Sequence, residues 1–236
     1  MKSFFDKLYK GSKAELFTLA DKNLIEGKKM FVVTANPEAF MQGKEDEVLR
    51  SLMLDEETIV VADGIGIVKG VKMLGLSITE RIPGVDLAEH LLMAAHETNK
   101  SVFLFGAKQE VLDSLCEVIK QKYSGLTLLG ATNGYVQDKD AVFMEIKELK
   151  PDIVLVALGI PHQEKLIYKH LSDFNKGIFV GVGGSFDVLS GTKARAPEFL
   201  IKCNLEWLYR LFKEPSRIKR FYNNNVKFIF SLKKIK

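Results

Sequence analysis

The stretch "GIFVGVGG" at residues 177–184 decides the fold, because it is a short apolar run that ends in glycines. Five similar runs precede it along the chain: "MFVVTAN" (30–36), "TIVVAD" (58–63), "SVFLFGA" (101–107), "LTLLGA" (126–131) and "DIVLVALG" (152–159). Nearly continuous apolar runs of this length are typical of parallel strands that are covered on both faces.

Longer segments of helical period separate these runs. We expect helices at 37–50, 86–99, 108–122, 138–149 and 162–171. The spacing of Asp86 and Glu89 in "DLAE" is that of a capping box, which predicts a helix start at Asp86. The alternation predicts an α/β fold, a Rossmann-like open and mostly parallel sheet with flanking helices.

The composition limits the class of protein. With 236 residues, 47% of them hydrophobic, the chain can bury a substantial core. Its two cysteines, Cys116 and Cys203, are too few for a disulfide framework, which favours a reducing cytoplasm. No run reaches the roughly 18 apolar residues that span a bilayer, so we expect any membrane contact to be peripheral.

The net charge of +4 is distributed unevenly. Residues 199–236 carry ten Lys and Arg against two Glu, a net charge of +8, which leaves −4 for residues 1–198. We therefore divide the chain into an α/β domain at 1–198 and a basic helical appendage at 199–236. Basic residues beside an aromatic-rich stripe favour a helix that lies on an anionic membrane. A helical hairpin that closes the core, or an oligomer contact, is the alternative.

In open α/β sheets the ligand binds outside the carboxyl ends of the strands. Polar residues and glycines gather at these positions: Thr34, Asn36, Asp63, Tyr135, Gln163, Gly181, Gly183, Gly184 and Asp187. The glycines would let backbone N–H groups approach a diphosphate, although a tight turn would also explain them. Because the third glycine of a dinucleotide fingerprint is missing, a nicotinamide cofactor is disfavoured.

Several of these side chains have two interpretations. Asp63 would serve as a general base, a ribose ligand or a cap. Asn36 before Pro37 is the usual start of a helix. Arg81 would clamp a phosphate or pair with the neighbouring Glu80.

Metal and nucleic-acid binding are both disfavoured. The pair of aspartates in "DKD" at 138–140 has the spacing of a cation site, but a helix start explains it as well. The four histidines show no metal-binding pattern. Nucleic acid would use the basic tail, but the acidic body argues against it. We expect no metal and no cofactor.

Six motifs follow one another along the chain: "TANPEAF", "ADGIGIVKG", "ERIPGVDL", "LGIPHQEK", "GVGGSFDVLSGTKARAP" and "NLEWLYRLFKEPSRIKRF". Their order and spacing resemble those of the WecG/TagA/CpsF glycosyltransferases over residues 30–222. The first 29 residues lack the usual entry motif of this family, so the resemblance says nothing of their role.

The resemblance implies an inverting, metal-independent transfer of N-acetylmannosamine from a UDP donor. The acceptor would be the N-acetylglucosamine of undecaprenyl-diphosphate-GlcNAc, and the product a lipid-linked disaccharide for wall teichoic acid or a related surface polymer. N-acetylmannosaminuronic acid or glucose would be alternative donor sugars. The enzyme would lie on the inner face of the cell membrane, as a monomer or a homo-oligomer.

By resemblance, Asp63 matches the catalytic base. The other catalytic-pocket residues would be Thr34, Asn36, Arg81 and Gln163. The residues that bind the substrates would be Tyr135, Gly181, Gly183, Gly184, Asp187, Arg195, Arg210, Arg217 and Arg220. The last three match arginines of an appendage that touches the membrane and covers the active site.

Overall fold

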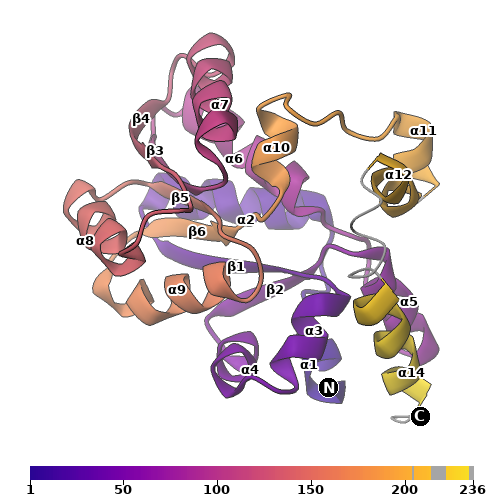
Figure 1. The fold of residues 1–236 in the computed structure, drawn as a ribbon. Coiled ribbons are helices and arrows are strands. Elements are labelled where there is room, and N and C mark those ends of the chain that lie inside the picture. Colours follow the sequence, from indigo (N-terminus) through magenta and orange to yellow (C-terminus); the bar gives the residue numbers. More distant parts are fainter. Residues whose placement is uncertain (204, 214–221, 234–236) are drawn as a thin grey trace.

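Six parallel strands form one open sheet in the order β2-β1-β6-β5-β3-β4 (Figure 1). The computed structural model describes residues 1–203, 205–213 and 222–233. The strands are β1 Lys29–Ala35, β2 Thr58–Ala62, β3 Ser101–Gly106, β4 Thr127–Thr132, β5 Ile153–Ala157 and β6 Gly177–Gly181. All five strand pairings are parallel, which confirms the fold predicted from the apolar runs.

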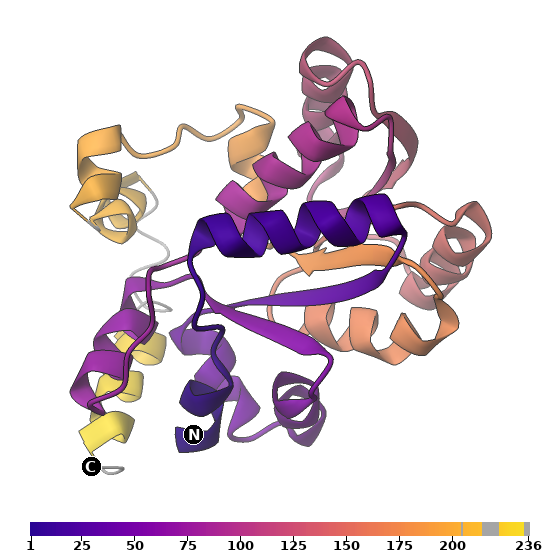
Figure 2. The same cartoon turned by 180° about the vertical axis from the view of Figure 1, so that it is seen from behind.

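The helices cover both faces of the sheet. Their bounds are α1 Lys2–Lys7, α2 Lys13–Glu26, α3 Pro37–Gly43, α4 Glu47–Leu54, α5 Ile65–Met73, α6 Gly84–Glu97, α7 Gln109–Lys122, α8 Lys139–Leu149, α9 His162–His170, α10 Ser185–Leu189, α11 Glu198–Lys202, α12 Glu206–Lys213 and α14 Lys227–Lys233, with a 3-10 turn η1 at Leu171–Asp173 and a π turn η2 at Tyr222–Val226. Helices α2, α6 and α7 pack on one face, and α4, α8 and α9 pack on the other (Figures 1 and 2). Five of the strands are almost wholly buried between these two layers, as their apolar runs predict, whereas the edge strand β4 is partly exposed.

Two helix boundaries differ from the prediction. The helix expected at 37–50 is two helices, because the chain leaves the helix after Gly43 and Asp46 caps a new one through the Leu49 N–H. The capping box expected at Asp86 is wrong. Helix α6 begins at Gly84 after Pro83, and Asp86 lies in its first turn, where it pairs with Lys13 and Arg195.

The first 29 residues complete the core. Ser12 caps α2, and the side chains of Ser12 and Glu15 bond each other's backbone N–H in a capping box. Phe4 and Phe5 of α1 are buried, and both rings meet Phe40 of α3 edge-on. This segment is therefore an integral layer of the α/β domain.

The end of the chain packs into the same core. Phe228 of α14 is fully buried, and its ring centroid lies 6.1 Å from those of Phe5 and Phe40. Figures 1 and 2 both show α14 beside α5, where Gly70 leaves room for Leu232. The described part of the appendage thus closes part of the core, as the alternative interpretation of the tail expected. The division at residue 198 stays a prediction.

Replacing Phe228 with alanine is expected to lower the free energy of unfolding by about 3–5 kcal/mol, because the ring would leave a cavity between α1, α3 and α5. Urea denaturation measures this loss. Phe230→Ala in the same helix is the matched control, since that ring is 62% exposed, and its effect should stay within about 0.5 kcal/mol. Equal effects of the two changes would contradict the described packing of α14.

Candidate active site

The carboxyl ends of β1, β2 and β6 bring three of the predicted site residues together. The Asp63 N–H donates to the Ala35 carbonyl at 2.9 Å, which fixes the start of the loop after β2 against the end of β1. On the other side of β1, the buried Thr34 hydroxyl donates to the Gly181 carbonyl at 2.8 Å. Thr34, Asp63 and Gly181 therefore lie at the carboxyl ends of three neighbouring strands, with β2 outermost, which is the side on which open α/β sheets have their ligand crevice.

The Asp63 carboxylate is partly exposed at this crevice. Its Oδ1 accepts from the Gly84 N–H at 3.3 Å, at the start of α6. A Cβ on Gly84 would lie 3.2 Å from Thr34 Cγ2, so α6 begins close against β1. The backbone contact thus orients a carboxylate that stays partly exposed to solvent.

Asn36 acts as a helix cap. Its Oδ1 accepts from the Ala39 N–H at 3.0 Å, and Pro37 occupies the first helical position of α3. The interpretation of "NP" as a helix start is confirmed. The cap also fixes the backbone that leads from Thr34 into α3.

Arg81 pairs with Glu206 of the appendage, and not with its neighbour Glu80. Arg81 Nη2 lies 3.2 Å from Glu206 Oε2, and both side chains are largely buried. Glu80 instead accepts from the Lys13 N–H at 2.7 Å. The ion pair ties the start of α12 to the loop between α5 and α6, 125 residues away in the chain.

Gln163 joins two glycine-containing loops. Its Oε1 accepts from the Gly159 N–H after β5 and from the Gly183 N–H after β6, both at 3.1 Å. Gly183 has a φ of +49°, in the left-handed region that favours glycine. The buried side chain of Gln163, at the start of α9, thus holds Gly183 in the loop after β6. β6 is the neighbour of β1, which carries Thr34.

Sequence reasoning missed Glu164, which follows Gln163. Its carboxyl group is fully buried, and Oε1 accepts from Gln163 Nε2 at 2.7 Å. Burial is the main cause that raises the pKa of Glu164 to about 7, and the nearby charge of Glu38 adds to it. An acid in the first turn of a helix is ordinarily explained by the helix dipole, so the sequence held no signal for this burial.

The segment after the glycine loop is fixed by ion pairs. Asp187, in α10, pairs with Lys193 at 3.0 Å. Arg195 pairs with Asp86 in the first turn of α6, and Lys13 reaches the same carboxylate at 3.3 Å. These contacts hold "KARAP" beside the start of α6 before the chain enters α11.

One predicted residue lies apart from this group, and three others cannot be placed from the described residues. Tyr135 follows β4, at the opposite edge of the sheet from β2, and its side chain is 73% exposed. Arg217 and Arg220 lie outside the described residues, as does the side chain of Arg210, whose backbone lies in α12.

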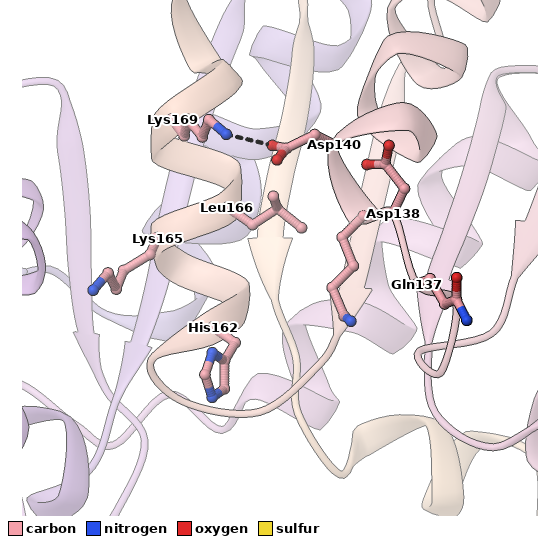
Figure 3. Close-up of a pocket in the computed structure, with 8 residues that line it drawn as sticks. Gln137, Asp138, Asp140, His162, Lys165, Leu166 and Lys169 are labelled. Carbon is pink, nitrogen blue, oxygen red and sulfur yellow. Dashed lines mark hydrogen bonds and ion pairs between the residues drawn. The ribbon is translucent and has the colours of Figure 1, made fainter.

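A separate pocket of about 520 Å³ opens between α8 and α9. Its lining residues are Gln137, Asp138, Lys139, Asp140, His162, Lys165, Leu166 and Lys169 (Figure 3). Asp138 caps α8 through the Ala141 N–H, and Asp140 pairs with Lys169 and with His170. The helix-start interpretation of "DKD" is therefore confirmed. Within residues 1–203, 205–213 and 222–233, no three His, Cys, Asp or Glu side chains converge as metal ligands would.

The glycosyl transferase WecG/TagA/CpsF family model matches residues 5–236. The chain belongs to this family. An N-acetylglucosaminyldiphosphoundecaprenol N-acetyl-beta-D-mannosaminyltransferase of Bacillus subtilis is 40% identical over 202 residues, which cover 85% of this chain and 78% of the relative. The protein of the same name from Staphylococcus aureus strain MW2 is 35% identical over 208 residues, covering 88% and 81%.

The family match extends over the first residues and the tail. The match starts at residue 5, in α1, although the sequence alone left the first 29 residues unassigned. It includes α12 and α14, which carry Glu206 and Phe228. In the portion of this transferase that the structure describes, no helix combines the length and apolarity needed to cross a bilayer.

Replacing Thr34 with valine is expected to lower the free energy of unfolding by about 1–3 kcal/mol, because the buried Gly181 carbonyl would lose its hydroxyl partner. Thermal and urea denaturation measure the loss. Thr58→Val is the matched control. The buried Thr58 hydroxyl, on β2, has no hydrogen-bond partner in the described structure, so its removal should be neutral or stabilising. A neutral Thr34→Val would show that the bond to Gly181 contributes nothing.

Proposed function

We propose that this enzyme transfers N-acetylmannosamine, with inversion, from UDP-N-acetylmannosamine to the GlcNAc of GlcNAc-diphosphoundecaprenol. The observation that carries the proposal is the placement of Asp63, Thr34 and the glycine loop at the carboxyl ends of neighbouring strands, in a chain whose relatives carry the name of this transferase. The product would be a β-linked lipid disaccharide for a cell-surface polymer.

In the proposed reaction Asp63 is the general base. It takes the proton of the acceptor hydroxyl as that oxygen attacks the anomeric carbon of the donor. The new bond joins the acceptor oxygen to this carbon, and the bond between the carbon and the diphosphate oxygen breaks. UDP leaves with the electron pair of that bond, and Asp63 holds the proton. The backbone contact from Gly84 orients the carboxylate for this step.

The growing charge on the leaving UDP needs stabilisation. We assign this role to backbone N–H groups of the loop Gly181–Gly184 and to the Arg81 guanidinium. Only Nη2 of Arg81 is used in the contact with Glu206, and a guanidinium carries five N–H donors. The arginine therefore keeps donors for a diphosphate oxygen while its position is set by the tail.

We also propose that the appendage attaches the enzyme to the inner face of the membrane, where the lipid-linked acceptor resides. Three large aromatic side chains of the appendage are exposed to solvent. They are Phe199, Phe212 and Phe230, which are 62–77% exposed. Such exposed rings in a basic segment would insert between anionic head groups. Self-association remains a further prediction.

Transfer assays with a panel of UDP-sugars and a short-chain lipid-linked GlcNAc acceptor test the proposal, with and without EDTA. UDP-N-acetylmannosamine should be the preferred donor over its uronic acid and UDP-glucose, and EDTA should leave the rate unchanged because we assign the charge stabilisation to protein groups. Turnover with a different sugar would correct the donor, and a rate lost in EDTA and restored by a divalent cation would overturn the metal-free mechanism. No transfer from any UDP-sugar would reject the proposed function.

Asp63→Asn is expected to lower kcat at least about 100-fold, because an amide cannot take the acceptor proton. UDP binding, measured by calorimetry, should change little, since the substitution keeps the size of the side chain. Near-normal turnover of this variant would remove Asp63 from the base role. Loss of UDP binding together with activity would instead indicate that Asp63 binds the donor.

The double variant Phe212→Ser and Phe230→Ser is expected to weaken binding to anionic vesicles by about tenfold or more, since each buried ring contributes about 1.5–3 kcal/mol. Vesicle co-sedimentation measures the loss. The double variant Ile25→Ser and Met93→Ser, which removes exposed apolar side chains of α2 and α6, is the control and should bind vesicles normally. If both double variants bound like the wild type, the tail would not be the membrane contact.

A further inference from the structure

We propose that Glu164 is a positioning residue of the donor site: through its hydrogen bond to Gln163, it holds the two glycine-containing loops in the arrangement that receives the sugar nucleotide. This inference rests on the proposed function, and it adds a residue that does not itself touch a substrate. The chain of contacts runs from Glu164 to Gln163 and from Gln163 to Gly159 and Gly183.

The Gln163 amide can adopt only one orientation in this arrangement. Its oxygen accepts from two backbone N–H groups, those of Gly159 and Gly183, at 3.1 Å each. The amide nitrogen must therefore face the other way, where it donates to Glu164 Oε1 at 2.7 Å. A flipped amide would direct N–H groups at two N–H donors, so the carboxyl group of Glu164 completes a fully matched set.

The Gln163 amide lies close against the backbone of Gly181. A Cβ on Gly181 would lie 2.7 Å from Gln163 Nε2, so the absence of a side chain at residue 181 is what admits the amide. The Gly181 carbonyl is in turn bonded by Thr34 on β1. Through Gln163, the contact with Glu164 is thus connected to the loops after β5 and β6 and, through Gly181, to Thr34 on β1.

Burial favours the neutral form of Glu164, whereas the hydrogen bond that Gln163 Nε2 donates to it favours the carboxylate, and burial outweighs that bond. The side chain is fully buried, and Oε2 has no hydrogen-bond partner among the described residues. The charged group that acts on it is Glu38 in the first turn of α3, and its charge disfavours ionisation. The basic residues that follow on α9 are already paired, Lys165 with Asp46 and Lys169 with Asp140.

A neutral carboxyl group also suits the ligand. An ionised Glu164 would place an uncompensated negative charge behind the loop that we assign to an anionic diphosphate. The pKa of Glu164 is raised from 4.5 to about 7, so the folded chain binds one more proton than the unfolded chain between these values. The stability that this group contributes therefore falls as the pH rises from 4.5 to about 7.

The first test compares Glu164→Leu with Glu164→Gln. Leucine cannot accept a hydrogen bond, so the buried Gln163 Nε2 would lose its partner, and we expect the KM for the donor to rise about tenfold with kcat within about threefold. Glutamine presents an amide oxygen at the same place and should restore the wild-type KM at pH 6. Between pH 6 and pH 8 the KM of the wild type should rise, whereas that of Glu164→Gln should stay flat.

A second measurement needs no substrate. Amide hydrogen exchange at Gly159 and Gly183 in the ligand-free chain should quicken in Glu164→Leu and stay slow in Glu164→Gln. Gly181→Ala should have the effect of Glu164→Leu without touching Glu164, because the new methyl group would displace Gln163. Thr58→Val, which alters another buried polar atom without a partner, is the control for stability alone and should leave exchange and KM unchanged.

The outcomes separate the two proposals. If the wild type transfers sugar but Glu164→Leu keeps its KM and its slow exchange, the positioning role is wrong. If the wild type transfers nothing, the proposed function fails, and the exchange data alone decide whether Glu164 holds the loops. If Glu164→Gln loses donor affinity as severely as Glu164→Leu, the hydrogen bond to Gln163 is not the means by which Glu164 acts, and the proposal is overturned.

Discussion

The hydrogen-bonded pairing of β1 with strands on both its sides is the constraint on which the site depends. β1 pairs with β2, its successor in the chain, and with β6, the last strand. Because all three are parallel, their carboxyl ends come to the same edge of the sheet. Thr34 therefore lies between Asp63 on one side and Gly181 on the other, although Gly181 is more than 100 residues away from both in sequence.

Three polar side chains at this edge of the sheet are fixed by hydrogen bonds to backbone N–H groups. Asn36 caps α3, Gly84 contacts Asp63, and Gln163 binds two loop amides. Preorganised dipoles of this kind stabilise developing charge without the cost of reorganisation. The buried carboxyl group of Glu164 adds to this network, since it accepts the hydrogen bond from the Gln163 amide nitrogen.

The described part of the appendage closes part of the core, which the sequence pattern alone presents as the alternative to a membrane contact. Phe228 and Leu232 bury one face of α14 in the core, while Phe230 of the same helix points outward. The ion pair between Arg81, in the loop between α5 and α6, and Glu206 fixes the start of α12. The tail is thus anchored at two places, and the exposed rings between and beyond the anchors remain available to a membrane.

The sequence by itself determined the six strands, the parallel sheet and the helix starts at Asn36 and Asp138, since each follows from local apolar runs and caps. The hydrophobic periodicity did not predict two helix boundaries: Asp46 caps a second helix inside the segment 37–50, and α6 begins at Gly84, directly after Pro83. The partners of Arg81 and Arg195 were decided only by the tertiary structure. A residue's type shows that it needs a counter-charge, but the groups that supply it here, Glu206 and Asp86, lie more than 100 residues away in the chain. Glu164 bonds its neighbour Gln163, but its burial depends on how α9 packs.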